Sequence, residues 1–211
     1  LCNSQKTLAV VVQHNAASSV YIYDVHTLKR SHSISNKLPL AIKSISIPRR
    51  DQLLILGDGP DYLLSLWNLQ ERVPSPVASV RLATPSGKEL RQASMENNII
   101  CVSGEGTLRL FRLVDKVFRP ITLNSLKGKP QDYIAHAWSP RGGLVLATKT
   151  EFWFFSGDTA NLKVRFHCNV STEWGQTVSV TALAALPSCV IIGGSDGFAR
   201  LYHYLGSDTD E

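Results

Sequence analysis

The side chains of this sequence that could support catalysis are few, and each has a simpler structural interpretation. Asp58 and Asp61 bracket a Gly-Pro pair, and paired carboxylates can serve acid–base chemistry. Aspartates in such a turn more often cap it by hydrogen bonds to the neighbouring backbone, and we favour this second role. His136 alternates with Trp138 in an expected strand. We therefore interpret His136 as a packed or rim side chain rather than a metal ligand.

Sequence motifs of enzymes and cofactor sites are absent from the chain. There is no Gly-x-Ser-x-Gly elbow, no P-loop and no His-Glu-x-x-His. Gly104-Glu-Gly106 begins like a dinucleotide fingerprint, but Arg109 stands where the third glycine would be, so we interpret it as a turn. The four cysteines form no Cys-x-x-Cys pair, which disfavours a zinc site and a disulfide scaffold and favours a reducing, intracellular location. We expect no enzyme activity, no metal and no cofactor.

Three arginines offer a different kind of chemistry, the electrostatic binding of a protein partner. Arg49, Arg50 and Arg141 follow Pro48 and Pro140 in two similar short turns. The chain has 22 Lys and Arg against 17 Asp and Glu, a formal charge of +5. A basic surface can meet an acidic partner, such as a tubulin surface or a nucleic acid. We expect these arginines to form a protein-binding patch, and unrelated surface charges are the alternative.

A six-residue segment recurs five times. The repeated units that it marks must position the candidate functional residues. The segments span residues 19–24, 63–68, 107–112, 151–156 and 198–203. The fifth residue of each is aromatic, at intervals of 44, 44, 44 and 47 residues: Tyr23, Trp67, Phe111, Phe155 and Tyr202. The second and fourth residues are apolar, and they share one face of a strand because strand side chains alternate. We predict that the five aromatics form the structural core of repeated units.

Each segment belongs to a unit of four strands. An apolar strand precedes each segment, at residues 8–12, 53–56, 99–102, 144–147 and 190–192. An alternating strand lies further upstream and a looser one follows the segment. No stretch keeps the periodicity of a long helix. Four strands that repeat at this interval are typical of a WD-repeat β-propeller, whose blades have ~40–45 residues. A β-sandwich is the alternative, but it does not require a constant interval between aromatic residues.

The sequence therefore predicts an all-β, WD-repeat-like β-propeller with about five visible blades. We place the blades at residues 1–38, 39–84, 85–126, 127–172 and 173–205, followed by an acidic tail at 206–211. The first blade has no room for its first strand, and the last stops after its third. Seven blades would need roughly 300 residues, so we expect the chain to be part of a larger, seven-bladed ring. No apolar run approaches the ~18–20 residues of a membrane span, so we expect no membrane partner.

Three stretches, in order, carry a family resemblance. They are residues 19–30, 57–69 and 100–113, the last followed by Asp132-Tyr-Ile-Ala-His-Ala-Trp-Ser-Pro140. Through them the chain, over residues 8–204, resembles the cilia- and flagella-associated WD-repeat proteins of the axoneme. It departs from the WD pattern because it has no Trp-Asp dipeptide: Trp67-Asn68 and Tyr23-Asp24 come nearest. The resemblance implies two tandem propellers followed by a coiled coil, and the chain shows no coiled coil.

The resemblance also implies a function, that of a non-catalytic scaffold which docks or regulates inner dynein arms on doublet microtubules. The implied partners are inner dynein arm components, other axonemal WD-repeat proteins and doublet microtubules, in the cytoplasm, cytoskeleton and ciliary or flagellar axoneme. A generic WD-repeat adaptor of another cytoplasmic complex, in trafficking or ribosome assembly, is one alternative. A propeller enzyme is another, but the blades offer no ring of His, Asp or Glu. We expect no nucleic acid because the periodic aromatics serve blade packing, with Trp153 and Trp174 as exceptions.

Overall fold

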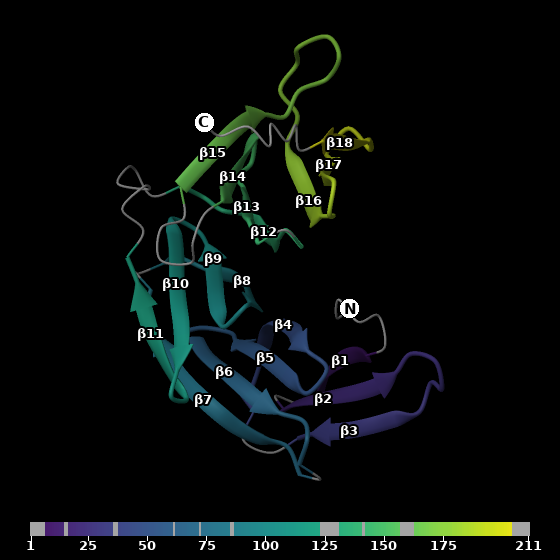
Figure 1. The fold of residues 1–211 in the computed structure, drawn as a ribbon, viewed down its shortest axis with the longest axis vertical. Helices are drawn as coiled ribbons and strands as arrows, with labels where there is room; N and C mark the ends of the chain where they lie inside the picture. Colours follow the sequence, from purple (N-terminus) through teal and green to yellow (C-terminus); the bar gives the residue numbers. More distant parts are fainter. Residues whose placement is uncertain are drawn as a thin grey trace, which may run out of the picture. The chain divides into compact units, whose positions relative to one another are not determined.

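The computed structural model describes residues 7–14, 17–35, 38–60, 62–71, 73–84, 87–122, 131–140, 142–156 and 163–203. In this part of the chain every long regular element is a strand and none is a helix, which confirms the predicted all-β class. The strands form five antiparallel sheets in which consecutive strands are neighbours (Figure 1). Sheets of this up-and-down kind are the blades of β-propellers. The chain divides into two compact units, residues 1–122 and 123–211.

The first unit holds three sheets, which we number as blades one to three. Blade one consists of β1 (Thr7–His14), β2 (Ala17–Asp24) and β3 (Arg30–Ile34). Blade two consists of β4 (Ile42–Arg49), β5 (Gln52–Gly57), β6 (Tyr62–Asn68) and β7 (Ser75–Leu82). Blade three consists of β8 (Leu90–Glu96), β9 (Ile99–Gly104), β10 (Thr107–Val114) and β11 (Val117–Ile121).

The second unit holds two sheets, blades four and five. Blade four consists of β12 (Ala135–Trp138), β13 (Leu144–Ala147), β14 (Glu151–Ser156) and β15 (Lys163–Asn169). Blade five consists of β16 (Val180–Ala185), β17 (Cys189–Gly194) and β18 (Ala199–His203). The recurring six-residue segments therefore correspond to β2, β6, β10, β14 and β18, each of which follows the predicted apolar strand of its blade.

Short turns with left-handed residues close several of these hairpins. Asn97 and Asn98, with φ of 47° and 64°, join β8 to β9, and Asp115 and Lys116, with φ of 51° and 62°, join β10 to β11. Two successive residues at positive φ give the turn whose twist matches paired strands, and asparagine tolerates this conformation better than most residues. Asp24 caps the turn after β2, where its Oδ1 accepts hydrogen bonds from the backbone N–H groups of residues 26 and 27.

In the first unit, successive blades bury apolar faces against each other. Val20 and Ile22 of β2 belong to one buried cluster with Trp67 of β6. In the next layer, Leu64 and Leu66 of β6 belong to a cluster with Phe111 of β10. The fifth-position aromatic of a blade thus packs against the second- and fourth-position residues of the blade before it. Burial of this apolar area is the main stabilising contribution of the interface.

The second unit repeats this arrangement between blades four and five. Phe152, the second-position residue of β14, lies in a buried cluster with Val190 and Ile192 of β17, and Tyr202 of β18 packs against that cluster. The rule seen in the first unit therefore holds here as well.

The five predicted core aromatics are buried to different degrees. Trp67, Phe111 and Phe155 are buried, and Trp67 is only 2% exposed with its Nε1 donating to Ser65 Oγ at 2.9 Å. Tyr23 and Tyr202 are half-buried, which differs from the expectation of a uniform core. For Tyr23 the reason is its face of blade one, where Leu8, Val10 and Val12 of β1 are also exposed.

Candidate protein-binding surfaces

The predicted arginine patch lies at the turn between β4 and β5. Arg49 ends β4, Arg50 occupies the turn, and both are exposed; Arg141 lies outside the described residues. Arg49 Nη2 donates to Asn98 Oδ1, 3.3 Å away in the equivalent turn of blade three. Arg50 makes no hydrogen bond or ion pair within the described part of the chain. Of the two described arginines of the predicted patch, Arg50 is thus the one without a hydrogen bond or ion pair to another described residue.

Acidic side chains lie close to these arginines. Burial raises the pKa of the half-buried Glu96, and the charge of Arg49 opposes that rise. A polar pocket of about 500 Å³ is lined by Lys116 together with Asp51 and Glu71. The turn between β10 and β11 therefore lies near the turn between β4 and β5. This side of the first unit therefore carries mixed charge, with Glu96 near Arg49.

A second surface, in the second unit, combines exposed aromatic side chains with a pocket. Trp174 is 88% exposed and Phe198 is 69% exposed, and Leu201 of β18 is exposed as well. These side chains line a pocket of about 750 Å³, whose full lining comprises Ser171, Thr172, Glu173, Trp174, Asp196, Phe198, Ala199, Arg200, Leu201 and Tyr202. We call this pocket the β18 groove.

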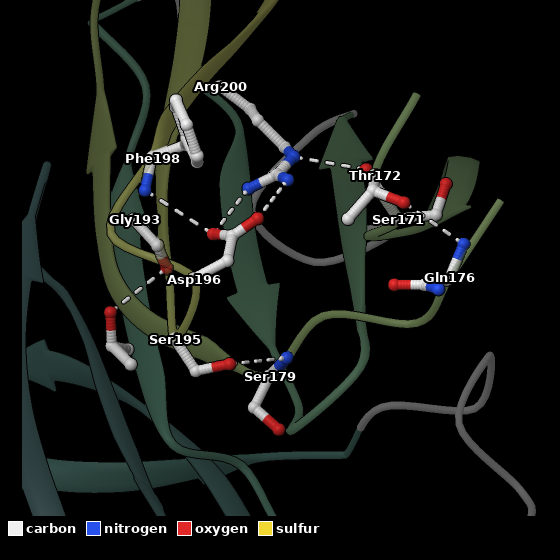
Figure 2. Close-up of polar contacts among 10 residues, drawn as sticks. Ser171, Thr172, Gln176, Ser179, Gly193, Ser195, Asp196, Phe198 and Arg200 are labelled. Carbon is white, nitrogen blue, oxygen red and sulfur yellow. Dashed lines mark hydrogen bonds and ion pairs between the residues drawn. The ribbon is translucent and has the colours of Figure 1, made fainter. Parts of the chain in front are cut away.

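Trp174 stands on a tight turn held by its own hydrogen bonds. Ser171 and Thr177 form an isolated β-bridge at its base. The backbone N–H of Thr172 donates to Gln176 O at 2.8 Å. The backbone N–H of Gln176 donates to Thr172 Oγ1 at 3.1 Å (Figure 2). Gly175 adopts a φ of 76°, a conformation that favours glycine. The large exposed indole is therefore presented by an ordered segment.

Arg200 ties this turn to the hairpin between β17 and β18. Its Nη1 and Nη2 donate to Asp196 Oδ1 and Oδ2 at 3.1 and 2.5 Å, and its Nε donates to Ser171 O at 3.0 Å (Figure 2). Asp196 Oδ1 also accepts the backbone N–H of Phe198 at 3.3 Å. The Arg200 guanidinium, with a smaller contribution from the Phe198 N–H, lowers the pKa of Asp196 to about 2. A bidentate pair of this kind fixes orientation as well as charge.

Comparison with known proteins identifies the fold. The chain is 22% identical over 162 residues to the mouse protein "Cilia- and flagella-associated protein 57", a match that covers 74% of this chain and 13% of that protein. No family model matches the chain. Among solved structures, the β-propeller domain of Cps50 (Swd1) from Myceliophteria thermophila superposes with a TM-score of 0.71 at 17% identity, over 100% of this chain and 66% of that one. The chain has a β-propeller fold.

Other similar structures differ widely from one another. Hydrazine synthase of Kuenenia stuttgartiensis gives a TM-score of 0.68 at 10% identity, over 97% of this chain and 70% of that one. The computationally designed protein Ika4 gives 0.54 at 15% identity, over 77% of this chain and 91% of the design. At such identities the likeness shows the fold alone, because one fold supports unrelated functions.

In two blades, the same position of the recurring segment holds an arginine that makes the same kind of hydrogen bond. This shared contact was not predicted from the sequence. Arg109 and Arg200 are both third residues of the recurring segment, and both follow an acid-Gly pair by three positions. Arg109 Nη2 donates to Ala83 O, just beyond β7, as Arg200 donates to Ser171 O, just beyond β15. Each arginine therefore connects its blade to the residues that follow the last strand of the preceding blade. The shared acid-Gly-x-x-Arg spacing was the available signal.

Two of the side chains considered for catalysis, His136 and Asp58, lie within the described residues. His136 is buried in β12, and desolvation lowers its pKa to about 3, so it is neutral at physiological pH. Asp58 Oδ1 accepts the backbone N–H of Gly59 at 2.8 Å, which agrees with a turn cap; Asp61 lies outside the described residues. Within the described residues, no group of three or more His, Cys, Asp or Glu could hold a metal ion. No helix found there is long and apolar enough to cross a membrane.

Proposed function

We propose that this chain is a non-catalytic propeller scaffold of the ciliary or flagellar axoneme, where it docks or regulates inner dynein arms on doublet microtubules. The observation that carries the proposal is the similarity to a cilia- and flagella-associated protein, which extends over 74% of the chain. The chain spans 13% of that relative's length, so other parts of such a protein would contribute to the assembly.

The β-propeller fold supports a scaffold because its rigid blades present turns and loops to partners. In the first unit, Arg50 is exposed at the turn after β4 and Lys116 at the turn after β10. Such side chains complement the acidic surface of a microtubule, and their main effect would be on encounter rate and orientation. We assign Arg50 as the principal basic contact, because Arg49 already binds Asn98 of blade three.

The proposal that the chain is non-catalytic is supported by the burial and the hydrogen bonds of the candidate catalytic groups. His136 is buried and neutral, and Asp58 caps a turn. Among the described carboxyl groups, Asp196 has a strongly lowered pKa, of about 2, because two nitrogens of Arg200 hold it. A carboxylate with so low a pKa is a poor general base near pH 7.

Cross-linking mass spectrometry on axonemes isolated from cells that express the tagged chain tests this function. We expect the tag along the cilium and cross-links from the first unit to inner dynein arm components or tubulin. Cross-links confined to trafficking or ribosome-assembly proteins, with no axonemal signal, would contradict the proposal and favour the generic cytoplasmic adaptor.

A further inference from the structure

Ser33 is an exposed serine on β3, the outermost strand of blade one. Its hydroxyl makes no hydrogen bond to any residue that the structure describes, whereas Ser31 Oγ, on the same strand, donates to Ile22 O at 3.1 Å. β3 pairs with β2 alone, just as β7 and β11 border their own sheets. Ser33 therefore offers an accessible nucleophilic oxygen at the outer rim of the blade.

The residues before Ser33 form a basic sequence of the kind that some kinases recognise. Lys29 and Arg30 precede the serine, and Arg30 stands three positions before it. Serine kinases that prefer basic substrates select an arginine at this position with acidic side chains of their substrate groove, a charge pattern that sets specificity. Two more serines of the chain, Ser75 and Ser94, have an arginine at the same spacing. The sequence alone therefore does not choose among the three.

The structure separates these three serines. Ser75 is half-buried, and its Oγ donates to Glu71 Oε2 at 3.0 Å. Ser94 is half-buried on β8, a strand that pairs with β9 and packs against β4 of blade two. Ser33 is the exposed member of the set, and its hydroxyl is unbonded within the described residues. It is therefore the serine that an enzyme can reach in the folded chain.

The position of Ser33 stays exposed in a blade that has a neighbour on the same side. Ser33 lies opposite Tyr21 and Ser79 lies opposite Ser65, and both partners are third residues of the recurring segment. Ser65 shares a face of β6 with Trp67, which is buried in a cluster with residues of blade one. Ser79 is nonetheless exposed, because it belongs to the outermost strand. A neighbouring blade therefore does not cover this position.

Arg30 is already placed to hold a phosphate on Ser33. Its Cζ lies 5.4 Å from the centroid of the Tyr21 ring, which is a cation–π contact. Tyr21 and Ser33 are directly opposite each other in the pairing of β2 with β3, so their side chains share one face, ~5 Å apart at Cβ. A guanidinium over the Tyr21 ring is therefore within reach of a group on Ser33 Oγ. A phosphate there carries a charge of about −1.5 to −2 and accepts two hydrogen bonds from a guanidinium.

We propose that Ser33 is a phosphorylation site for a serine kinase that selects basic substrates. Ser33 Oγ attacks the γ-phosphorus of ATP, the bond from that phosphorus to the β–γ bridging oxygen breaks, ADP leaves, and the hydroxyl proton passes to the catalytic base of the kinase. Arg30 first marks the site for the kinase and then pairs with the phosphate, which neutralises the charge of Lys29 and Arg30 at the turn after β2. The site does not depend on the proposed axonemal function.

Phosphorylation of the folded 211-residue chain by a constitutively active calmodulin-dependent kinase, with ATP and site mapping by mass spectrometry, tests this site. Synthetic peptides spanning residues 27–38 and 88–99 report what the kinase does with each sequence outside the fold. We expect both peptides to be labelled, and the folded chain to be labelled at Ser33 and not at Ser94. Arg30→Ala should lower the rate at Ser33 about tenfold, because a charged contact to the kinase is lost. Ser79→Ala, a change at the equivalent position of blade two, should leave that rate unchanged.

The phosphorylated chain provides a second test, of the pairing with Arg30. It should melt at a higher temperature than the unmodified chain at low salt, and the difference should shrink as salt screens the pair. A lower melting temperature after phosphorylation would show that Arg30 does not hold the phosphate. Absence of label at Ser33 in the folded chain, whether or not the 27–38 peptide is labelled, overturns the site. So do equal rates at Ser33 and Ser94 in the folded chain, and an unchanged rate in Arg30→Ala.

Discussion

The ring of Tyr202 meets the ring of Phe152 edge-on, with centroids 4.7 Å apart and planes inclined by 61°. Tyr202 holds the fifth position of its segment and Phe152 the second position of the preceding one. The same pairing of positions brings Trp67 to Val20 and Ile22 in the first unit. One sequence repeat therefore defines one kind of blade interface within each unit, in which Trp67, Phe111 and Tyr202 have the same role although their rings differ.

Truncation of a buried aromatic of this series should cost more than truncation of a half-buried one. We expect Trp67→Ala to lower the free energy of unfolding by ~3–5 kcal/mol, because the side chain is almost fully buried and leaves a cavity. Urea denaturation followed by circular dichroism measures the loss. Tyr23→Ala is the matched control, since Tyr23 occupies the same position but is half-buried. Equal losses for the two variants would show that blade position, not burial, sets the cost.

The fold could be predicted from the sequence because its information is local and periodic. Alternating apolar residues identify strands, and a constant interval between aromatics identifies repeated blades. The predicted strand at His136 and Trp138 is β12, and the predicted apolar strand at 190–192 lies in β17. The half-burial of Tyr23 was not expected, because it depends on what covers the face of blade one. The seven-bladed ring stays a prediction.

The binding surfaces were harder to predict because their contacts join distant residues. Arg49 and Asn98 are 49 positions apart, and Arg200 and Ser171 are 29 apart. Nothing in the local sequence around Trp174 distinguishes an exposed indole from a packed one. The arginine patch was inferred from similar turns at Arg49, Arg50 and Arg141, and it stays a prediction because Arg141 lies outside the described residues. That reasoning did not foresee that Arg49 would bind Asn98.

The buried histidine should make the chain less stable in mild acid. The unfolded chain takes up a proton at His136 as the pH falls through its ordinary value of 6.5, whereas burial keeps the folded side chain neutral down to about 3. Stability from this group is therefore full above pH 6.5 and decreases as the pH falls toward 3, by as much as about 1.4 kcal/mol per pH unit. Urea denaturation at pH 7, 6 and 5 should show a smaller slope in His136→Gln than in His203→Gln, an exposed control. Identical slopes would contradict the burial argument.

The ion pair between Asp196 and Arg200, two residues that line the β18 groove, should weaken in strong acid. The pKa of Asp196 is about 2 in the folded chain, against an ordinary value of 3.8. Its contribution is therefore present above pH 3.8 and is lost as the pH falls toward 2. Asp196→Asn should have a lower melting temperature than the parent at pH 6, and the difference should shrink between pH 4 and pH 2. A difference that is constant with pH would mean that the carboxylate charge contributes nothing to the hairpin.

Charge reversal at the exposed arginine of the first unit tests the electrostatic part of the proposed function. Arg50→Glu should weaken co-sedimentation with isolated doublet microtubules severalfold at low salt, and the effect should fade as salt screens the charges. The folded state should be unaffected, because Arg50 makes no hydrogen bond or ion pair within the described residues. Arg119→Glu makes the same charge change on β11, where the side chain is exposed and forms a 3.8 Å ion pair with the exposed Asp115. If both variants bind as the parent does at low salt, the turn after β4 is not a contact. If both weaken binding equally, net charge rather than this turn attracts the microtubule.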